Sequence, residues 1–351
     1  MATGADFGQT SGHPTVRGAE LAVNEINDAG GVLIDGEPHQ LRLVVEEHEQ
    51  RGESAASKAR LLINRDGVNA IVGPQTSATA IPVAKVADLA GVPMISPMSS
   101  NALTTSARQF AFRLAFLDEM QGTVLAQYSI TEGGATTAAV LFDEALKYAS
   151  GLAKTFRGAF ESAGGTVVAY ESYTTDAAET FSDQLKRIAA ADPDVLFLPN
   201  ITTVDSIQMV EARALGVRAT FIGSDSWDMQ RLRVLDAAEG AVISHQWHYE
   251  SPTPAVVAFL DRFDAAYGRV PRTTAAMTYD AVGVLSEALG MAGTAEAGAI
   301  RDALRSVNGY TGVTGTISFL GGHDPERSVV ISTIRDGEIV VVGPVEPMTG
   351  T

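Results

Sequence analysis

Short apolar runs alternate with amphipathic segments through most of this chain, and this alternation limits its fold more than any other feature. The runs TVVAY (166–170), DVLFLP (194–199) and ATFIGS (219–224) have the length and composition of buried strands. Segments with apolar residues at helical spacing lie between them, and strand, helix, strand recurs about every 25–30 residues, as is typical of βαβ units. The chain is therefore predicted to be an α/β protein with parallel sheets.

The number of these units predicts more than one domain. The chain has 351 residues, and a domain typically has about 100–200. We predict two doubly wound, Rossmann-like lobes with no low-complexity linker, so that the chain crosses between lobes within ordered segments. Locally, the alternation in LRLVVEE (41–47) predicts a strand, and Asp336-Gly337 between two β-branched runs predicts a tight hairpin.

Composition excludes several classes of function. The formal net charge of −17 repels nucleic acid and anionic membrane surfaces. The chain has no cysteine, which excludes disulfides, thiol catalysis and zinc–thiolate sites. No apolar run approaches the roughly 18 residues of a membrane-spanning helix. The opening MATGADFGQTSG has neither the basic nor the apolar region of a signal peptide.

An enzyme is the rival class, and its common signatures are missing. The sequence has no nucleophile elbow, phosphate-binding P-loop, H-E-x-x-H or G-x-G-x-x-G motif. His245 and His248 are three residues apart, so on a strand they face opposite sides and are poorly placed to share a metal ion. We therefore predict no catalytic residue, metal ion or cofactor.

Two loops rich in small hydroxyl residues follow neighbouring predicted strands. GPQTS (73–77) comes after VNAIVG and opens a predicted helix, and SPMSSN (96–101) comes after a second apolar run. In open parallel sheets, ligands bind beyond the carboxyl ends of the strands, and a helix N-terminus attracts an anion. The alternative is that Thr76 or Ser77 merely caps the helix.

A carboxylate stands at the same kind of position in the second half. Asp225 in FIGSDSWD follows a predicted strand, and it could receive an ammonium group or cap a helix near Asp228 to Leu235. Hydroxyls with a helix N-terminus from one half and a carboxylate from the other would together hold a zwitterion. A free amino acid is such a ligand.

Several segments in order resemble the leucine/isoleucine/valine-type periplasmic binding proteins of ABC transporters, which have the type I periplasmic binding protein fold. They include RGAELAVNEINDAGG, IVGPQTSATAIPVAKVADLAGVPMISPMSSNALT, FRLAFLDEMQGTVLAQY, KYASGLAKTF, GSDSWD and MTYDAVGVLSEAL. The family opens with a strand before a Leu-Thr-Gly turn, whereas this sequence starts at MATG, which matches only the turn. We therefore expect that strand, and any export signal, upstream of Met1.

The resemblance implies a set of ligand contacts. Ser77 matches the serine that binds the ligand carboxylate, Met98 a backbone contact, and Ser100 a position usually held by threonine. Tyr148 matches a tyrosine that closes over the ligand from the second lobe, and Asp225 matches the acidic residue that receives the ammonium. Four further residues are implied with less constant roles, namely Thr202 as a contact and Phe7, Trp227 and Tyr279 as lining of the side-chain pocket.

The resemblance also implies an architecture and a function. Residues 1–118 and 249–326 would form one lobe and residues 119–248 and 327–351 the other, joined by a three-segment hinge. A neutral, aliphatic L-amino acid would bind in the cleft between the lobes and be delivered to the membrane permease. The protein would then be a monomeric, periplasmic or otherwise extracytoplasmic receptor, without membrane insertion or nucleic-acid binding. The alternative is a regulatory protein that senses amides or carboxylates with the same fold.

Overall fold

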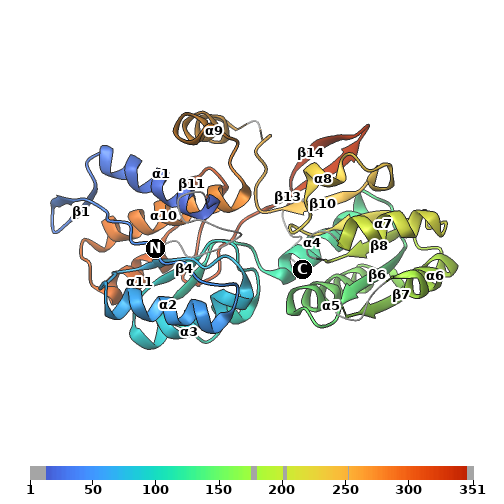
Figure 1. Ribbon diagram of the computed structural model, residues 1–351, viewed down its shortest axis with the longest axis horizontal. Coiled ribbons are helices and arrows are strands. Elements are labelled where there is room, and N and C mark those ends of the chain that lie inside the picture. Colours follow the sequence, from blue (N-terminus) through green and yellow to red (C-terminus); the bar gives the residue numbers. More distant parts are fainter. Residues whose placement is uncertain (1–12, 175–179, 201–203, 252, 346–351) are drawn as a thin grey trace. The chain divides into compact units, whose positions relative to one another are not determined.

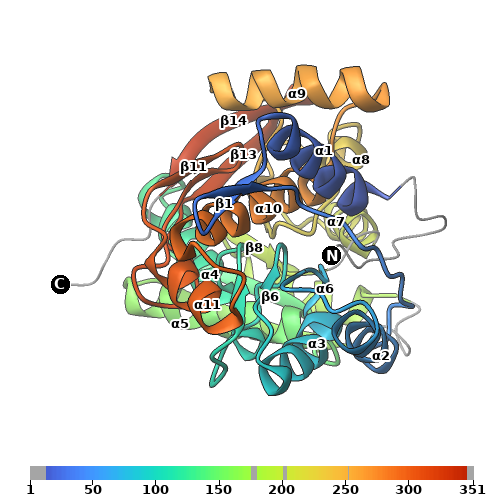
Figure 2. The same cartoon turned by 90° about the vertical axis from the view of Figure 1, so that its left-hand side faces the viewer.

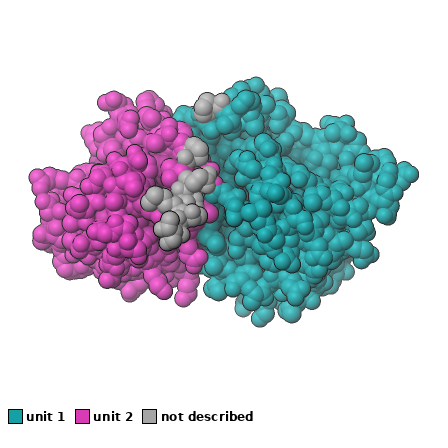
Figure 3. Space-filling view, turned by 180° about the vertical axis from the view of Figure 1, so that it is seen from behind, with its two compact units in different colours: residues 1–117, 246–327 teal, residues 118–245, 328–351 magenta. Residues whose placement is uncertain are grey.

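The structure consists of two compact units. The computed structural model describes residues 13–174, 180–200, 204–251 and 253–345. Unit 1 comprises residues 1–117 and 246–327, and unit 2 comprises residues 118–245 and 328–351, as coloured in Figure 3. The chain therefore passes from one unit to the other three times. The lobe boundaries expected from the sequence, at residues 118, 248 and 326, lie within three residues of these passages.

Unit 1 contains a parallel sheet of three short strands, in the order β3 (Ile71–Val72), β4 (Met94–Ser96) and β5 (Ala111–Arg113). Side chains alternate between the faces of a strand, so residues in register share a face. The residues in register on one face belong to one apolar cluster, and those on the other face belong to a second. The first face carries Ile71, Met94 and Ala111, and the second carries Val72, Ile95 and Phe112. Both faces of the sheet are thus buried, as in most parallel sheets.

Helices cover these two faces. On one face, α2 (Gly52–Asn64) packs with α3 (Ser77–Ala90). On the other, α1 (Pro14–Asp28) packs along α10 (Thr273–Ala292), followed by α11 (Ala297–Ser306), as Figure 2 shows. The remaining elements of unit 1 are α9 (Pro254–Tyr267), the 3₁₀ turn η2 (Ala102–Thr104) and two hairpins, β1 (Val32–Ile34) with β2 (Glu37–His39) and β11 (Tyr310–Gly312) with β12 (Gly315–Ile317).

The predicted strand at residues 41–47 is wrong. This segment pairs with no strand in the described part of the chain, although its side chains alternate as predicted. Leu41, Leu43 and Val45 pack against one cluster of unit 1, and Val44 packs against the other. Alternation reports which side chains are buried, whereas a strand also requires a hydrogen-bonded neighbour.

Unit 2 contains a seven-stranded sheet in the order β14-β13-β10-β9-β8-β6-β7 (Figure 1). Its strands are β6 (Thr137–Asp143), β7 (Thr166–Tyr173), β8 (Val195–Leu198), β9 (Thr220–Gly223), β10 (Val242–His245), β13 (Val329–Arg335) and β14 (Glu338–Val345). The five strands from β10 to β7 are parallel, and β13 and β14 are antiparallel. The predicted α/β class with parallel sheets is confirmed.

The helices of unit 2 lie on both faces of this sheet. The helices are α4 (Asp118–Thr131), α5 (Lys147–Ser162), α6 (Ser182–Ala191), α7 (Val204–Ala214) and α8 (Met229–Leu232), with the 3₁₀ turn η4 (Asp236–Ala238). Phe156 of α5 stacks on Phe197 of β8 with ring centroids 4.4 Å apart. The neighbouring Leu196 and Leu198 face the opposite cluster, which contains residues of α6 and α7.

Two features of unit 2 agree with the sequence prediction. Asp336 and Gly337 connect β13 to β14 with φ angles of 53° and 72°, so the predicted hairpin is confirmed. The strand order reverses at β6, because the chain adds β7 on one side and β8, β9 and β10 on the other. Ligands of such sheets bind beyond the carboxyl ends of the strands next to the reversal. The residues that follow β6, β8 and β9 are therefore candidates for ligand contacts in unit 2.

Candidate ligand site at the carboxyl ends of the strands

The first group of candidate residues lies in unit 1, where β3 and β4 end side by side. Ser77 is the first residue of α3, and the loop after β4 carries Met98 and Ser100. The Ser77 hydroxyl is hydrogen-bonded to the Ser99 hydroxyl at 3.0 Å and accepts a long hydrogen bond from the Asn101 amide at 3.4 Å. The two loops that the sequence singled out are thus in direct contact.

The N-terminus of α3 lacks a side-chain cap. Its N-cap residue is Thr76, whose hydroxyl is hydrogen-bonded to the Thr79 hydroxyl at 2.8 Å and accepts no amide of the first turn. The bonds of the Ser77 hydroxyl lead instead to the second loop. The capping alternative for Thr76 and Ser77 is therefore wrong. A helix start without a capping side chain keeps backbone donors and partial positive charge for another acceptor.

Met98 and Ser100 flank Ser99 in the second loop. Met98 is half-buried against the apolar cluster that contains Ile95 and Phe112. Ser100 is only 4% exposed. A serine hydroxyl can donate one hydrogen bond and accept others. Ser100 is thus suited to donate to a bound anion.

The second group lies in unit 2. Tyr148 in the first turn of α5 donates its O–H to Oδ1 of Asp225, which follows β9, at 2.5 Å. The same phenol makes a weaker contact of 3.4 Å with Oε1 of Gln121. Withdrawal from water raises the pKa of Tyr148 well above its usual value, and the negative charges of Asp225 and Asp118 raise it further. The phenol therefore remains a protonated donor at neutral pH.

Asp225 does not cap the helix that follows it. The N-cap of α8 is Asp228, whose carboxylate accepts from the Arg231 amide at 3.3 Å. The helix-cap alternative for Asp225 is therefore wrong. Asp225 is instead half-buried beside the phenol of Tyr148. A carboxylate oxygen accepts more than one hydrogen bond, so a ligand N–H can add to this pair.

Comparison with known proteins assigns the chain to a family. Residues 3–338 match the family described as periplasmic binding protein. The chain belongs to this family. It is 30% identical over 300 residues to the Leu/Ile/Val-binding protein BraC3 of Rhizobium johnstonii, with 84% of this chain and 79% of the relative covered. The family membership predicted from the sequence is confirmed.

Solved structures of transporter binding proteins share the fold. One is the branched-chain amino acid transporter substrate binding protein LivJ of Streptococcus pneumoniae in complex with isoleucine, with a TM-score of 0.83 at 29% identity over 95% of this chain and 94% of that one. Another is an ABC transporter substrate-binding protein of Desulfitobacterium hafniense in complex with Leu, with a TM-score of 0.82 at 28% identity over 94% of this chain and 96% of that one.

Two other residues that were predicted to contact the ligand, Trp227 and Tyr279, make hydrogen bonds within their own units of this periplasmic binding protein. Trp227 is 5% exposed in the core of unit 2, where its indole N–H donates to the Leu198 carbonyl at 3.0 Å. In unit 1 the Tyr279 hydroxyl donates to Glu25 at 2.5 Å. Burial and this carboxylate raise the pKa of Tyr279 to about 12. Both rings thus have partners within their own unit. Phe7 and Thr202 lie outside the described residues.

Sequence reasoning missed two residues that touch the candidates. Ser99 orients the Ser77 hydroxyl, and Gln121 links Tyr148 to the Ser244 hydroxyl, to which its Nε2 donates at 2.9 Å. The serine doublet in SPMSSN was a usable signal for Ser99, since both hydroxyls lie in the same loop. Nothing in the local sequence distinguishes Gln121, because its contacts come from elements distant in the chain.

Among the described residues, no three His, Asp or Glu side chains converge to form a metal site. In the part of the chain that the structure describes, every helix is too short or too polar to cross a membrane.

Proposed function

We propose that this periplasmic binding protein binds a neutral, aliphatic L-amino acid as its zwitterion and delivers it to the permease of an ABC transporter. The observation that carries the proposal is the opposite chemistry of the two candidate groups. Unit 1 offers hydroxyls beside an uncapped helix N-terminus, and unit 2 offers a carboxylate beside a phenol. The loops at 73–77 and 96–101 contain no Lys or Arg, which speaks against a phosphorylated ligand.

In this proposal the unit 1 residues bind the ligand carboxylate. Ser77 and Ser100 donate their hydroxyls, and the first amides of α3 add donors and a favourable dipole. Ser77 is already oriented by Ser99, so little freedom is lost when the anion binds. Met98 contributes its backbone and a half-buried apolar surface.

The unit 2 residues bind the ammonium group. Asp225 supplies the charge, and Tyr148 fixes one of its oxygens by a hydrogen bond of 2.5 Å. An ion pair with charge-assisted hydrogen bonds is stronger than a neutral one and selects for the amine. A sugar has neither charge, so it cannot replace these interactions.

Two kinds of support favour an aliphatic amino acid. The family relative from Rhizobium johnstonii is named a Leu/Ile/Val-binding protein, and the Streptococcus pneumoniae structure holds isoleucine. The lining of the side-chain pocket by Phe7, Trp227 and Tyr279 stays a prediction, and so does the ligand contact of Thr202. By the same family argument we propose that the protein acts outside the cytoplasm as a monomer, binds without turnover and has neither nucleic acid nor membrane lipid as a partner.

A thermal-shift panel of amino acids, amides, carboxylic acids, sugars and nucleotides tests the proposal. A ligand at about a thousand times its dissociation constant stabilises by about 4 kcal/mol, which raises the melting temperature clearly. We expect leucine, isoleucine or valine to give the largest shift and sugars and nucleotides to give none. A clear shift with a sugar and none with any amino acid would refute the proposal. Uptake of labelled amino acid should fall when the gene is deleted, whereas the sensing alternative predicts unchanged uptake.

A further inference from the structure

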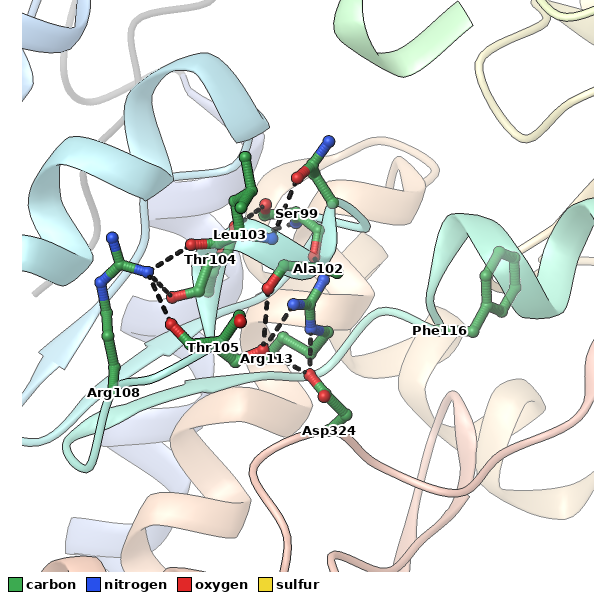
Figure 4. A network of polar contacts seen from close by, with 12 residues as sticks. Ser99, Ala102, Leu103, Thr104, Thr105, Arg108, Arg113, Phe116 and Asp324 are labelled. Carbon is green, nitrogen blue, oxygen red and sulfur yellow. Dashed lines mark hydrogen bonds and ion pairs between the residues drawn. The ribbon is translucent and has the colours of Figure 1, made fainter. Parts of the chain in front are cut away.

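A buried arginine lies beneath the loop that carries Ser100. Arg113 ends β5, and its side chain is 0% exposed. Its guanidinium donates to the Asp324 carboxylate, to the Thr105 hydroxyl at 2.6 Å and to the Ser99 carbonyl at 3.0 Å, as Figure 4 shows. A buried guanidinium is costly unless its donors are satisfied, so these three acceptors are held firmly in place.

The same guanidinium fixes the loop of residues 99–105 at both of its ends. Ser99 is bound through its carbonyl, and Thr105 is bound through its hydroxyl. The Thr105 hydroxyl in turn donates to Asp324 at 2.7 Å, which closes a triangle of charged and polar groups. Inside the loop, the Ser99 and Thr104 hydroxyls are hydrogen-bonded at 2.6 Å. These hydrogen bonds hold the loop, which includes Ser100, in one conformation.

The network continues from the arginine to the Ser77 hydroxyl and to the backbone next to Ser100. The Ser99 hydroxyl is hydrogen-bonded to Ser77 at 3.0 Å, and Ser100 is the next residue along the backbone. Asp324 holds the guanidinium of Arg113 from a segment that lies 211 residues further along the chain. Backbone contact reinforces this anchor, since the Arg113 amide donates to the His323 carbonyl at 3.2 Å.

We propose that Arg113 and Asp324 are positioning residues for ligand binding, which set the affinity for the ligand carboxylate by fixing Ser99 and, through it, the hydroxyls of Ser77 and Ser100. The inference rests on the proposed function. A purely structural network would instead stabilise unit 1 without affecting the affinity of the folded protein.

Asp324→Asn and Thr105→Val are the informative variants. The Asp324 side chain is 38% exposed, so an amide is tolerated there, and valine matches threonine in shape but lacks the hydroxyl. Each should weaken binding of L-leucine about tenfold, equivalent to about 1.4 kcal/mol, in calorimetric titrations well below the melting temperature.

Arg113→Lys should weaken L-leucine binding more, because an ammonium cannot reproduce the fork of donors of a guanidinium. Asp194→Asn is the control, since that carboxylate accepts hydrogen bonds from Thr136 and Thr137 in unit 2.

Two further measurements separate positioning from stability. When Ser77 is already replaced by Ala, Asp324→Asn should weaken L-leucine binding further by less than about threefold. The effects of two residues on affinity are not additive when one acts through the other. In the ligand-free protein, Asp324→Asn should speed hydrogen exchange of residues 99–105 about tenfold and leave α5 unchanged. Unchanged exchange, or affinity within about twofold of wild type, overturns the positioning role. A different result is that the wild-type protein binds no amino acid while Asp324→Asn still speeds hydrogen exchange of residues 99–105. That result overturns the proposed function, but it supports the role of Asp324 in holding the loop.

Discussion

Replacing Asp225 tests the proposed ammonium site. In Asp225→Asn the side chain keeps its shape and one acceptor oxygen, whereas Asp225→Ala removes both. Asp228, not Asp225, caps α8, so neither change removes a helix cap. The Tyr148 hydroxyl, 2.5 Å from Oδ1 in the wild type, can still donate to the amide oxygen of the Asn variant. The folded structure should therefore survive in Asp225→Asn, and the change in affinity reports the charge.

The magnitude follows from the burial of the pair. Asp225 is half-buried, and a bound ammonium would be withdrawn from water beside it. Removing one member of a buried, hydrogen-bonded charge pair costs about 2–5 kcal/mol, largely because the other charge stays unpaired. At about 1.4 kcal/mol per decade, Asp225→Ala should weaken L-leucine binding by roughly 30-fold to several thousand-fold. The loss of affinity in Asp225→Asn should lie in the lower part of this range.

Calorimetric titration of L-leucine into the wild type and both variants measures this effect. Asp228→Asn is the matched control, because asparagine caps a helix about as well as aspartate and the site lies outside the proposed contacts. We expect the control to bind like the wild type. Binding of L-leucine to Asp225→Asn within about threefold of the wild type would show that no ammonium is bound there.

Two other predictions concern stability. A Cβ on Gly18 would lie 2.2 Å from the Ala275 carbonyl oxygen, so Gly18→Ala should destabilise by about 1–3 kcal/mol in urea unfolding, whereas Gly158→Ala, with open space around it, should stabilise by up to about 1 kcal/mol. Equal effects of the two would refute the close packing of α1 on α10. Amides and hydroxyls of Thr136 and Thr137 lower the pKa of Asp194 to about 2 from 3.8. Its stabilising contribution is therefore present above the unfolded value of 3.8 and lost as pH falls toward 2, and Asp194→Asn should flatten that part of the stability–pH curve.

Much of the fold follows from local sequence patterns. Asp336 and Gly337 both adopt positive φ, which an Asp-Gly pair permits, so the hairpin could be predicted from two residues. The segment at 41–47 shows the limit of this reasoning. Its alternation correctly separates Val44 from Leu43 and Val45, but a hydrogen-bonded ladder depends on a neighbouring strand that no local pattern reveals.

The position of the candidate site was predictable, and its hydrogen-bonding contacts were less so. Strand ends and hydroxyl-rich loops indicated Ser77 and Ser100, because the topology of a parallel sheet brings such ends to one edge. Charge alone could not separate Asp225 from Asp228, which differ in whether the carboxylate accepts a helix amide or a phenol. Arg113 and Asp324 could not be predicted, since their pairing joins segments 211 residues apart.

Comparing L-leucine with its two singly charged analogues tests the central claim most directly. 4-Methylpentanoate lacks the ammonium group, and 3-methylbutylamine lacks the carboxylate, while both keep the branched side chain. If hydroxyls and the α3 N-terminus bind the carboxylate and Asp225 binds the ammonium, each analogue should bind at least about 30-fold more weakly than L-leucine in calorimetric titrations. Binding of either analogue within about threefold of L-leucine would contradict recognition of a zwitterion.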